Sequence, residues 1–137
     1  MDAVIQSFLA GFPVLILHFG LTVALLAAGV TVYVVITPIH EITLIRQNNV
    51  AAAVSLAGAV VGMAIPLASA MASSVNALDI LIFGVVAMVL QLVAYKAGDL
   101  VLRDLTQRIE KGELASAILL VGIKLGVSAI TAAAVNV

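Results

Sequence analysis

Four long apolar segments divide this sequence, and a short polar stretch separates each from the next. We place them at Val14–Ile36, Val50–Met71, Leu78–Ala97 and Leu114–Ala134. Roughly 20 helical residues cross the hydrocarbon core of a bilayer, and these segments neither match the shorter length of a barrel strand nor alternate in polarity. The sequence therefore predicts an all-α integral membrane protein, with four transmembrane helices in a single domain over residues 1–137.

The composition supports a membrane environment. Hydrophobic residues make up 64% of the chain and charged residues 9%, whereas about 25% of the residues in a soluble domain are charged. A net charge of −1 gives no reason to expect nucleic acid as a partner. The chain has no cysteine, which excludes disulfides, thiolate zinc sites and thiol nucleophiles. No basic stretch precedes the first apolar segment, so we expect no cleaved signal peptide.

The basic residues predict an orientation. All but one of them lie in the connections that follow the first and third apolar segments or, for Lys96, at the very end of the third segment: Arg46, Lys96, Arg103, Arg108 and Lys111. Cytoplasmic loops carry an excess of Lys and Arg. We therefore expect both connections in the cytoplasm and both termini in the periplasm.

The first connection contains the pattern of a short helix. Thr37-Pro38 is typical of an N-cap followed by the first helical position, and Asn48-Asn49 can end the helix. Pro13 suits the first turn of the first span for the same reason. Asn76, three residues before Asp79, is typical of a side-chain cap for the third span.

The second connection is longer and rich in charge. Asp99 with Arg103, and Asp104 with Arg108, are spaced as (i, i+4) ion pairs with the acid first. This connection either extends the third span into the cytoplasm or lies on the membrane surface.

The sequence also predicts an internal repeat. Ile16-Leu17-x-Phe19-Gly20 recurs as Ile80-Leu81-x-Phe83-Gly84, and Gly58-x-x-x-Gly62 recurs as Gly122-x-x-x-Gly126. We expect two two-helix units, about 13–72 and 77–136, that point the same way because each crosses the membrane twice.

The four paired glycines predict close helix packing. Membrane helices associate where small residues allow their backbones to approach, and Gly58, Gly62, Gly122 and Gly126 lie on such small-residue faces. The contact is either within one subunit or between subunits.

Lys124 is the most unusual residue, because it lies at the centre of the fourth span. A lysine there costs roughly 2.5–3.5 kcal/mol on insertion scales. At helical spacing it lies in line with Ser128 and Thr131, which predicts a polar path that selects anions or couples to protons. The alternative is a lysine that is neutral or hydrogen-bonded to a neighbouring helix.

Other polar residues give weaker signals. His18 in the first span and Gln91 in the third are further candidates for this path, although each is also compatible with an interfacial or interhelical hydrogen bond. His40 and Glu41 are adjacent, but no second His or Cys stands nearby to complete a metal site. The sequence contains no nucleophile–base pattern, phosphate loop or dinucleotide fingerprint. We expect no enzyme, no metal and no cofactor.

The first connection and second span together resemble a known family. The residues that carry the resemblance are Ile36-Thr37-Pro38-x-x-Glu41-x-x-Leu44-Ile45-Arg46-x-Asn48-Asn49-x-Ala51-Ala52, then Gly58-x-x-x-Gly62-x-x-Ile65-Pro66-Leu67-x-Ser69-Ala70. This pattern is similar to the bacterial inner-membrane family called domain of unknown function 350, or uncharacterised protein family 0719. The resemblance covers the whole chain and implies four spans in two duplicated halves.

The resemblance also implies kinds of partner, because members tend to be encoded beside phage-shock-protein-A-like membrane-stress proteins and ATP-grasp ligases. The chain departs from the family in its last span, where Thr131-Ala132-Ala133-Ala134-Val135 replaces a frequent Asn-Ala-Ala-Cys-Met. Lys124 is not part of the family pattern, so it is at most a specialisation of this chain.

Two functions follow as hypotheses. The first is an oligomeric channel or transport-type protein for ions or small solutes, since four short helices leave little room for a path within one subunit. The second is a structural or membrane-stress module whose connections bind a cytoplasmic protein. A small multidrug-type exporter is less favoured, because the acids lie in the connections, at the ends or at span boundaries. In every case the partners include membrane lipid and a second copy of the chain.

Overall fold

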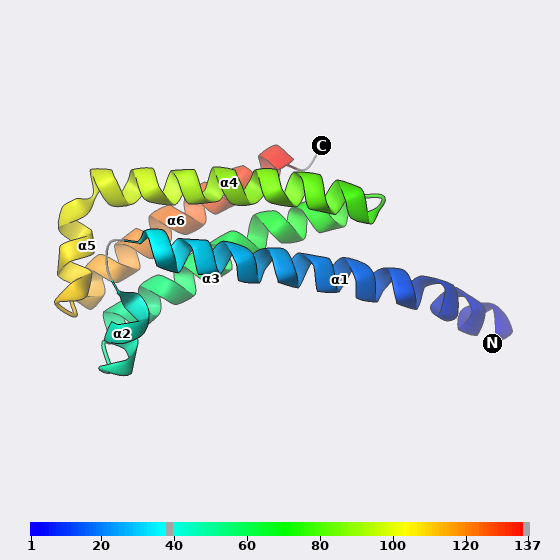
Figure 1. The fold of residues 1–137 in the computed structure, drawn as a ribbon, viewed down its shortest axis with the longest axis horizontal. Helices are drawn as coiled ribbons and strands as arrows, with labels where there is room; N and C mark the ends of the chain where they lie inside the picture. The colour runs from blue at the N-terminus through cyan, green and yellow to red at the C-terminus, as the bar shows by residue number, and fades with distance from the viewer. Residues whose placement is uncertain (38–39, 136–137) are drawn as a thin grey trace.

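The computed structural model describes residues 1–37 and 40–135, and every regular element in these ranges is a helix. In chain order the helices are α1 (Asp2–Ile36), α2 (Glu41–Arg46), α3 (Val50–Ser73), α4 (Ala77–Val101), α5 (Arg103–Glu110) and α6 (Leu114–Val135). The four long helices run lengthwise together, with α2 and α5 at one end (Figure 1). By length and composition α1, α3, α4 and α6 can each cross a membrane. The predicted all-α membrane fold with four spans is confirmed.

Helix α3 occupies the middle of the bundle and contacts each of the other described helices. Its most extensive contact is with α6. Small residues make this possible, because a Cβ atom added to Gly58 would lie 2.5 Å from the side chain of Val121 on α6. Close backbone approach between these two helices therefore positions the middle of α6, including Lys124, beside α3.

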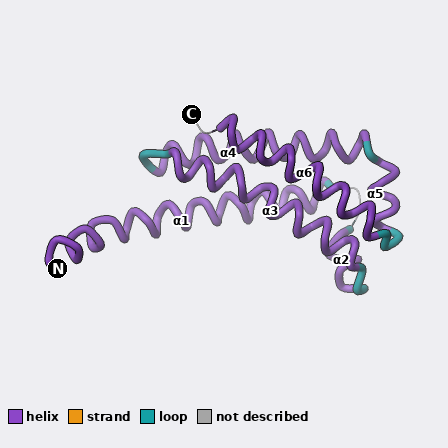
Figure 2. Tube along the Cα trace, turned by 180° about the vertical axis from the view of Figure 1, so that it is seen from behind, coloured by secondary structure: helices purple, strands orange, loops and turns teal. Residues whose placement is uncertain are grey.

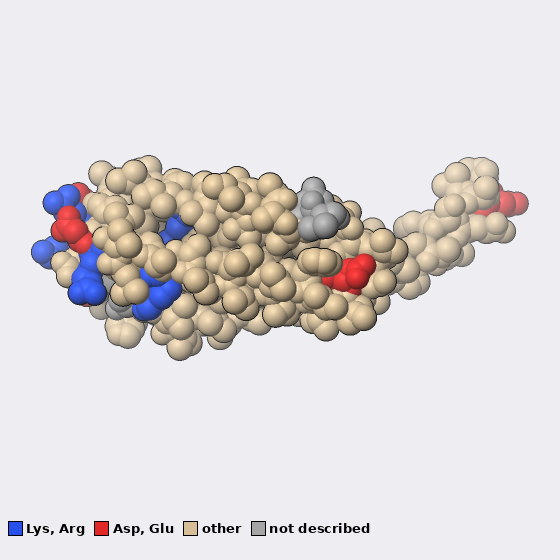
Figure 3. Space-filling model, turned by 90° about the horizontal axis from the view of Figure 1, so that it is seen from above, with Lys and Arg blue, Asp and Glu red and all other residues tan. Residues whose placement is uncertain are grey.

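The two polar connections meet at one end of the bundle. The side-chain amide of Asn49 donates to the carbonyls of Ile109 at 3.4 Å and Glu110 at 3.2 Å. Lys and Arg side chains gather at this end, which also carries α2 and α5 (Figure 3). The grouping of the basic connections on one side is thus a property of the fold, while their cytoplasmic orientation stays a prediction.

Helix α1 begins earlier than the sequence analysis predicts. It starts at Asp2 rather than Val14, and Pro13 lies inside the helix rather than in its first turn. A proline removes only one backbone hydrogen bond, and the apolar residues before it continue the helical pattern. At 1.5 Å per residue, the 35 residues of α1 extend about 50 Å. Its N-terminal part projects beyond the other helices (Figures 1 and 2).

The prediction that Thr37 caps the short helix is wrong. Helix α2 begins at Glu41 with His40 as its N-cap, while Thr37 ends α1 and donates its hydroxyl to the carbonyl of Tyr33. Pro38 lies outside the described residues. The asparagines agree with the prediction: Asn48 has a φ of 65° just after α2, and Asn49 caps α3 by accepting from the amide of Ala52.

The predicted cap of the third span is confirmed, since Asn76 accepts from the amide of Asp79 at 3.0 Å. The second connection extends the third span only in part, and a position of its remainder on the membrane surface stays a prediction. Helix α4 continues past Ala97 to Val101, and α5 then leaves in a new direction after Leu102 (Figure 1). Each half of the chain thus has the order long, short, long helix, and the sequence repeat itself stays a prediction.

Candidate functional site

Lys124 is buried inside the bundle, with only 3% of its surface exposed. Side chains of helical residues point towards the N-terminus of their helix, and α6 begins at the end that carries the connections. The ammonium nitrogen of Lys124 donates to the hydroxyl of Tyr33 on α1 at 2.7 Å. The same nitrogen lies 3.7 Å from Oδ1 of Asp99 on α4, which is also buried. Lys124 therefore joins three of the four long helices.

Tyr33 connects Lys124 to a second buried acid. Its hydroxyl donates to Oε1 of Glu41 at 3.0 Å, and Glu41 is only 2% exposed. The other oxygen of this carboxyl group, Oε2, has no hydrogen-bond partner among the described residues. Since Glu41 is the first residue of α2, the short helix of the connection is folded back onto the spans by this contact.

Two aromatic rings complete the surroundings of the ammonium group. The nitrogen of Lys124 lies 4.8 Å from the ring centre of Tyr33 and 5.0 Å from that of Tyr95, and the rings meet edge to face. Ammonium groups within about 6 Å of an aromatic face are attracted by its quadrupole. We call Tyr33, Glu41, Tyr95, Asp99 and Lys124 the lysine cluster.

The lysine cluster depends on a glycine of α3. A Cβ atom on Gly62 would overlap the hydroxyl of Tyr95, which donates to the carbonyl of Ala59 at 3.3 Å. The carbonyl of Gly62 accepts from Ser128 at 2.6 Å. Gly62 therefore makes room for one ring of the cluster and anchors α6 at the same level.

The buried charges of the lysine cluster do not balance when both acids are ionised. Two carboxyl groups, Glu41 and Asp99, face one ammonium group, Lys124. Burial raises the pKa of Glu41 from about 4.5 to about 7; the nearby Asp99 also raises it, while the hydrogen bond from Tyr33 and the charge of Lys124 oppose the shift. The net effect of the surroundings is to favour the protonated form of Glu41 relative to an exposed glutamate.

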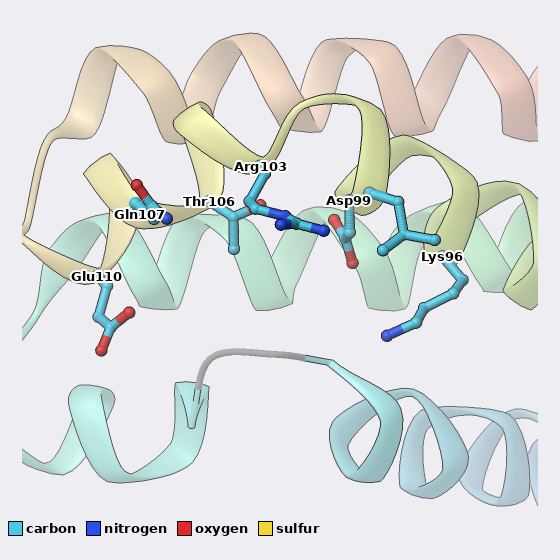
Figure 4. Close-up of a pocket in the computed structure, with 7 residues that line it drawn as sticks. Lys96, Asp99, Arg103, Thr106, Gln107 and Glu110 are labelled. Atoms are coloured by element: carbon cyan, nitrogen blue, oxygen red, sulfur yellow. The ribbon is translucent and has the colours of Figure 1, made fainter.

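A pocket of about 350 Å³ lies beside the lysine cluster, at the end of α4. Figure 4 shows its lining, which consists of Lys96, Asp99, Leu100, Arg103, Thr106, Gln107 and Glu110. Lys96 is half-buried and donates to the carbonyl of Ile36, the last residue of α1, at 3.1 Å. Arg103 and Glu110 are exposed. The pocket therefore opens beside the buried Asp99, at the end of the bundle that carries the connections.

The predicted pair of Asp99 with Arg103 is wrong, because Asp99 pairs with Lys124 instead. An (i, i+4) pair needs one continuous helix, and the helix is interrupted at Leu102 between these two residues. The second predicted pair is confirmed, with Arg108 lying 3.5 Å from Asp104 within α5.

The other residues of the predicted polar path lie in different places. Ser128 and Thr131 are buried further along α6 than Lys124. The hydroxyl of Ser128 donates to the carbonyl of Gly62, and that of Thr131 donates to the carbonyl of Val127. Gln91 is fully buried, and neither atom of its amide has a partner among the described residues. His18 lies apart from these residues, half-buried beside a surface pocket that includes Met71 near the end of α3.

The four predicted packing glycines divide into two pairs. Gly58 and Gly62 face α6 and α4 closely, as described above. Gly122 and Gly126 are exposed, and a Cβ atom on either would meet nothing within 4 Å. The α3 pair therefore makes contacts within the subunit, whereas the α6 pair faces outward.

Among the motif residues of the first connection, Glu41 alone enters the lysine cluster. Arg46 lies in the last turn of α2, matching the helix dipole, and Pro66 is buried within α3. Within the described ranges, no group of three His, Cys, Asp or Glu residues could hold a metal ion.

Comparison with known proteins places the chain in a family. The profile described as Domain of Unknown Function (DUF350) matches residues 7–135. The chain belongs to this family. It is 34% identical over 92 residues to the UPF0719 inner membrane protein YjfL of Escherichia coli (strain K12), a stretch that covers 67% of this chain and 70% of that protein. YjfL of Escherichia coli O157:H7 matches to the same extent. No solved structure matches the chain.

The DUF350 assignment and the four apolar helices agree on the class of protein. The chain is a multi-pass inner membrane protein. The family resemblance inferred from the motif in the first connection and second span is confirmed.

In this DUF350 protein, sequence reasoning missed the partners of Lys124. Tyr33, Tyr95 and Asp99 were not among the candidate residues, and Glu41 was included only as part of the motif. A signal was available, because a lysine at the middle of a span requires a nearby acid or acceptor. Asp99, close to the end of the third apolar segment, is within reach only because α4 continues to Val101.

Proposed function

We propose that this DUF350 protein is a channel or transport-type membrane protein for ions or small solutes, acting as a homo-oligomer. The observation that carries the proposal is the lysine cluster, in which Lys124, Asp99 and Glu41 are buried among membrane-spanning helices beside a pocket. Buried charges in a membrane are costly and mark ion pathways or proton relays. A purely structural bundle is at least as stable with apolar residues at such positions.

The oligomeric part of the proposal is supported by the outward-facing glycines of α6. Gly122 and Gly126 leave a shallow face that a helix from a second copy would fit. Small solute paths in membranes are commonly lined by several subunits or helices, and one copy of this chain offers only four long helices.

Flux into liposomes that carry the purified protein tests the proposal. We expect flux of at least one ion or small solute, and we expect Lys124→Ala to change its rate. Lys111→Ala is the matched control, because Lys111 follows α5 and is exposed. Absence of flux for every ion and small solute tried, with the protein correctly inserted, would contradict the proposal.

A second candidate function is a membrane-stress or structural module that binds a cytoplasmic protein through α2 and α5. The observation that favours it is the gathering of Lys and Arg side chains at this end of the bundle (Figure 3). Partners of the kinds encoded beside the family, phage-shock-protein-A-like proteins and ATP-grasp ligases, are the first to test. Charge reversal of Arg46, Arg103 and Arg108 should abolish binding in a pull-down without affecting insertion; binding that survives the reversal rejects this function.

A further inference from the structure

We propose that Glu41 and Asp99, with Lys124 between them, form a binding site for one proton that exchanges with the solution through the pocket beside Asp99. The site holds the proton on a carboxylate oxygen, and loading it neutralises one negative charge. No other bond is made or broken. The role of this proton in flux rests on the proposed function, whereas the binding site itself does not.

The first argument is the balance of buried charge. Lys124 can neutralise only one of the two acids, and both Glu41 and Asp99 are at least 95% buried. An uncompensated buried carboxylate costs several kcal/mol, so such a group takes up a proton instead. One bound proton makes the three-residue group neutral.

Among the described residues, Lys124 is the one basic side chain that forms an ion pair with either acid. Helix α3 contains no ionisable residue, and α1 contributes only the hydroxyl of Tyr33 at this level. The other ionisable groups face the site from α4 and α5: Tyr95, Lys96, Arg103 and Glu110. Lys96 attracts Asp99 at longer range but donates to the carbonyl of Ile36, and neither Lys96 nor Arg103 lies within 4 Å of a carboxylate oxygen of the described residues. Both line the open pocket, where solvent weakens their effect on the acids.

The second argument is the unpartnered oxygen of Glu41. Oε1 accepts from Tyr33, but Oε2 has no hydrogen-bond partner among residues 1–37 and 40–135 and is inaccessible to solvent. A buried carboxylate with one unbonded oxygen is poorly stabilised, whereas a protonated carboxyl group carries less charge to stabilise. Oε2 is therefore the oxygen at which the structure accommodates the proton.

The third argument is the chain of contacts that joins the two acids. Asp99 lies beside Lys124, Lys124 donates to Tyr33, and Tyr33 donates to Glu41. Interacting acids of this kind titrate as a unit rather than separately. Loss of the proton from Glu41 strengthens its attraction for Lys124, which already lies nearer to Tyr33 than to Asp99.

Infrared spectroscopy of the full-length protein in lipid nanodiscs tests the site. We expect the wild-type protein to keep one protonated carboxyl group above the pH at which exposed acids ionise, with a midpoint at about pH 7. Glu41→Gln should remove this carboxyl signal. Asp99→Asn should move its midpoint to lower pH, because Asp99 raises the pKa of Glu41. Asp104→Asn is the matched control, since Asp104 is an exposed acid on α5, and it should leave the signal unchanged.

A wild-type protein without any protonated carboxyl group near neutral pH would overturn the proton site, whether or not the variants fold. A signal that Glu41→Gln does not affect would do the same. The titration needs no flux, so the two proposals fail separately: a titrating carboxyl group without flux rejects only the transport function. Flux without a titrating carboxyl group rejects only the proton site.

Discussion

The ammonium nitrogen of Lys124 on α6 lies 3.7 Å from Oδ1 of Asp99 on α4, and both side chains are almost completely buried. Removing one partner of a buried ion pair leaves an uncompensated charge and costs about 3–5 kcal/mol, whereas replacing both partners with neutral groups can cost little. The intact pair therefore adds little net stability, whereas loss of either partner alone is costly.

The first prediction concerns this pair. Lys124→Met should lower the free energy of unfolding by about 3–5 kcal/mol, as measured by equilibrium unfolding from mixed micelles. The double variant Lys124→Met/Asp99→Asn should be more stable than the sum of the two single changes predicts, because no charge is then left alone. Lys111→Met, at an exposed position after α5, should have little effect. Strictly additive effects of the two changes would show that the pair is not coupled.

The second prediction concerns Tyr33, whose hydroxyl serves both Lys124 and Glu41. Tyr33→Phe should lower the free energy of unfolding by about 1–3 kcal/mol, since two buried charged groups each lose a hydrogen bond. It should also raise the pKa of Glu41 above about 7, because the hydrogen bond from Tyr33 holds that pKa down.

Tyr95→Phe is the control for this prediction, because the hydroxyl of Tyr95 donates to the carbonyl of Ala59 and bonds neither Glu41 nor Lys124 in the part of the chain that the structure describes. Infrared titration of both variants separates the effect of the bridging hydroxyl on the pKa of Glu41 from the effect of ring packing. An equal change in the pKa of Glu41 in both would show that ring packing, rather than the bridging hydroxyl, sets it.

The spans were predictable from the sequence because length and hydropathy decide what a bilayer accepts. The starts of the second, third and fourth spans agree closely with α3, α4 and α6. Helix α1 starts earlier than predicted because Pro13 does not end it: apolar helix-forming residues continue on both sides of the proline.

The lysine cluster was harder to predict for a different reason. Helical periodicity shows which residues share a face of one helix, but the partners of Lys124 come from α1, α2 and α4. Asp99 can pair with Lys124 because the helix is interrupted at Leu102, so that Arg103 no longer lies on the same helix face as Asp99. Glu41 becomes available because α2 folds back onto the bundle. Both events depend on contacts between helices, which a single sequence does not report.

The third prediction is a dependence of stability on pH. The pKa of Glu41 is about 7 in the folded protein, above its usual value of about 4.5. The folded state therefore binds the proton more tightly than the unfolded state, and its advantage is complete below pH 4.5. As the pH rises from about 4.5 to above 7, the free energy of unfolding should fall by roughly 3 kcal/mol.

Unfolding measured at a series of pH values checks this dependence. Glu41→Gln should abolish the fall in the free energy of unfolding between the unfolded-state and folded-state pKa values of Glu41. Glu113→Gln is the control, because Glu113 is half exposed beside Arg108 at the end of the bundle. If the wild-type protein becomes more stable as the pH rises through this range, Glu41 does not carry the proton.

The fourth prediction uses the two glycine pairs to separate contacts within the subunit from contacts between subunits. Gly62→Ala should lower the free energy of unfolding by about 1–3 kcal/mol, because the new methyl group overlaps the hydroxyl of Tyr95. Gly122→Ala should leave subunit stability unchanged or slightly higher, since nothing lies within 4 Å of its added Cβ atom. In a homo-oligomer that packs along the exposed face of α6, however, Gly122→Ala and Gly126→Ala should weaken assembly, as measured by the molecular mass in nanodiscs or by cross-linking. An assembly that both variants leave intact would place the subunit interface elsewhere, and the outward glycines of α6 would then face lipid.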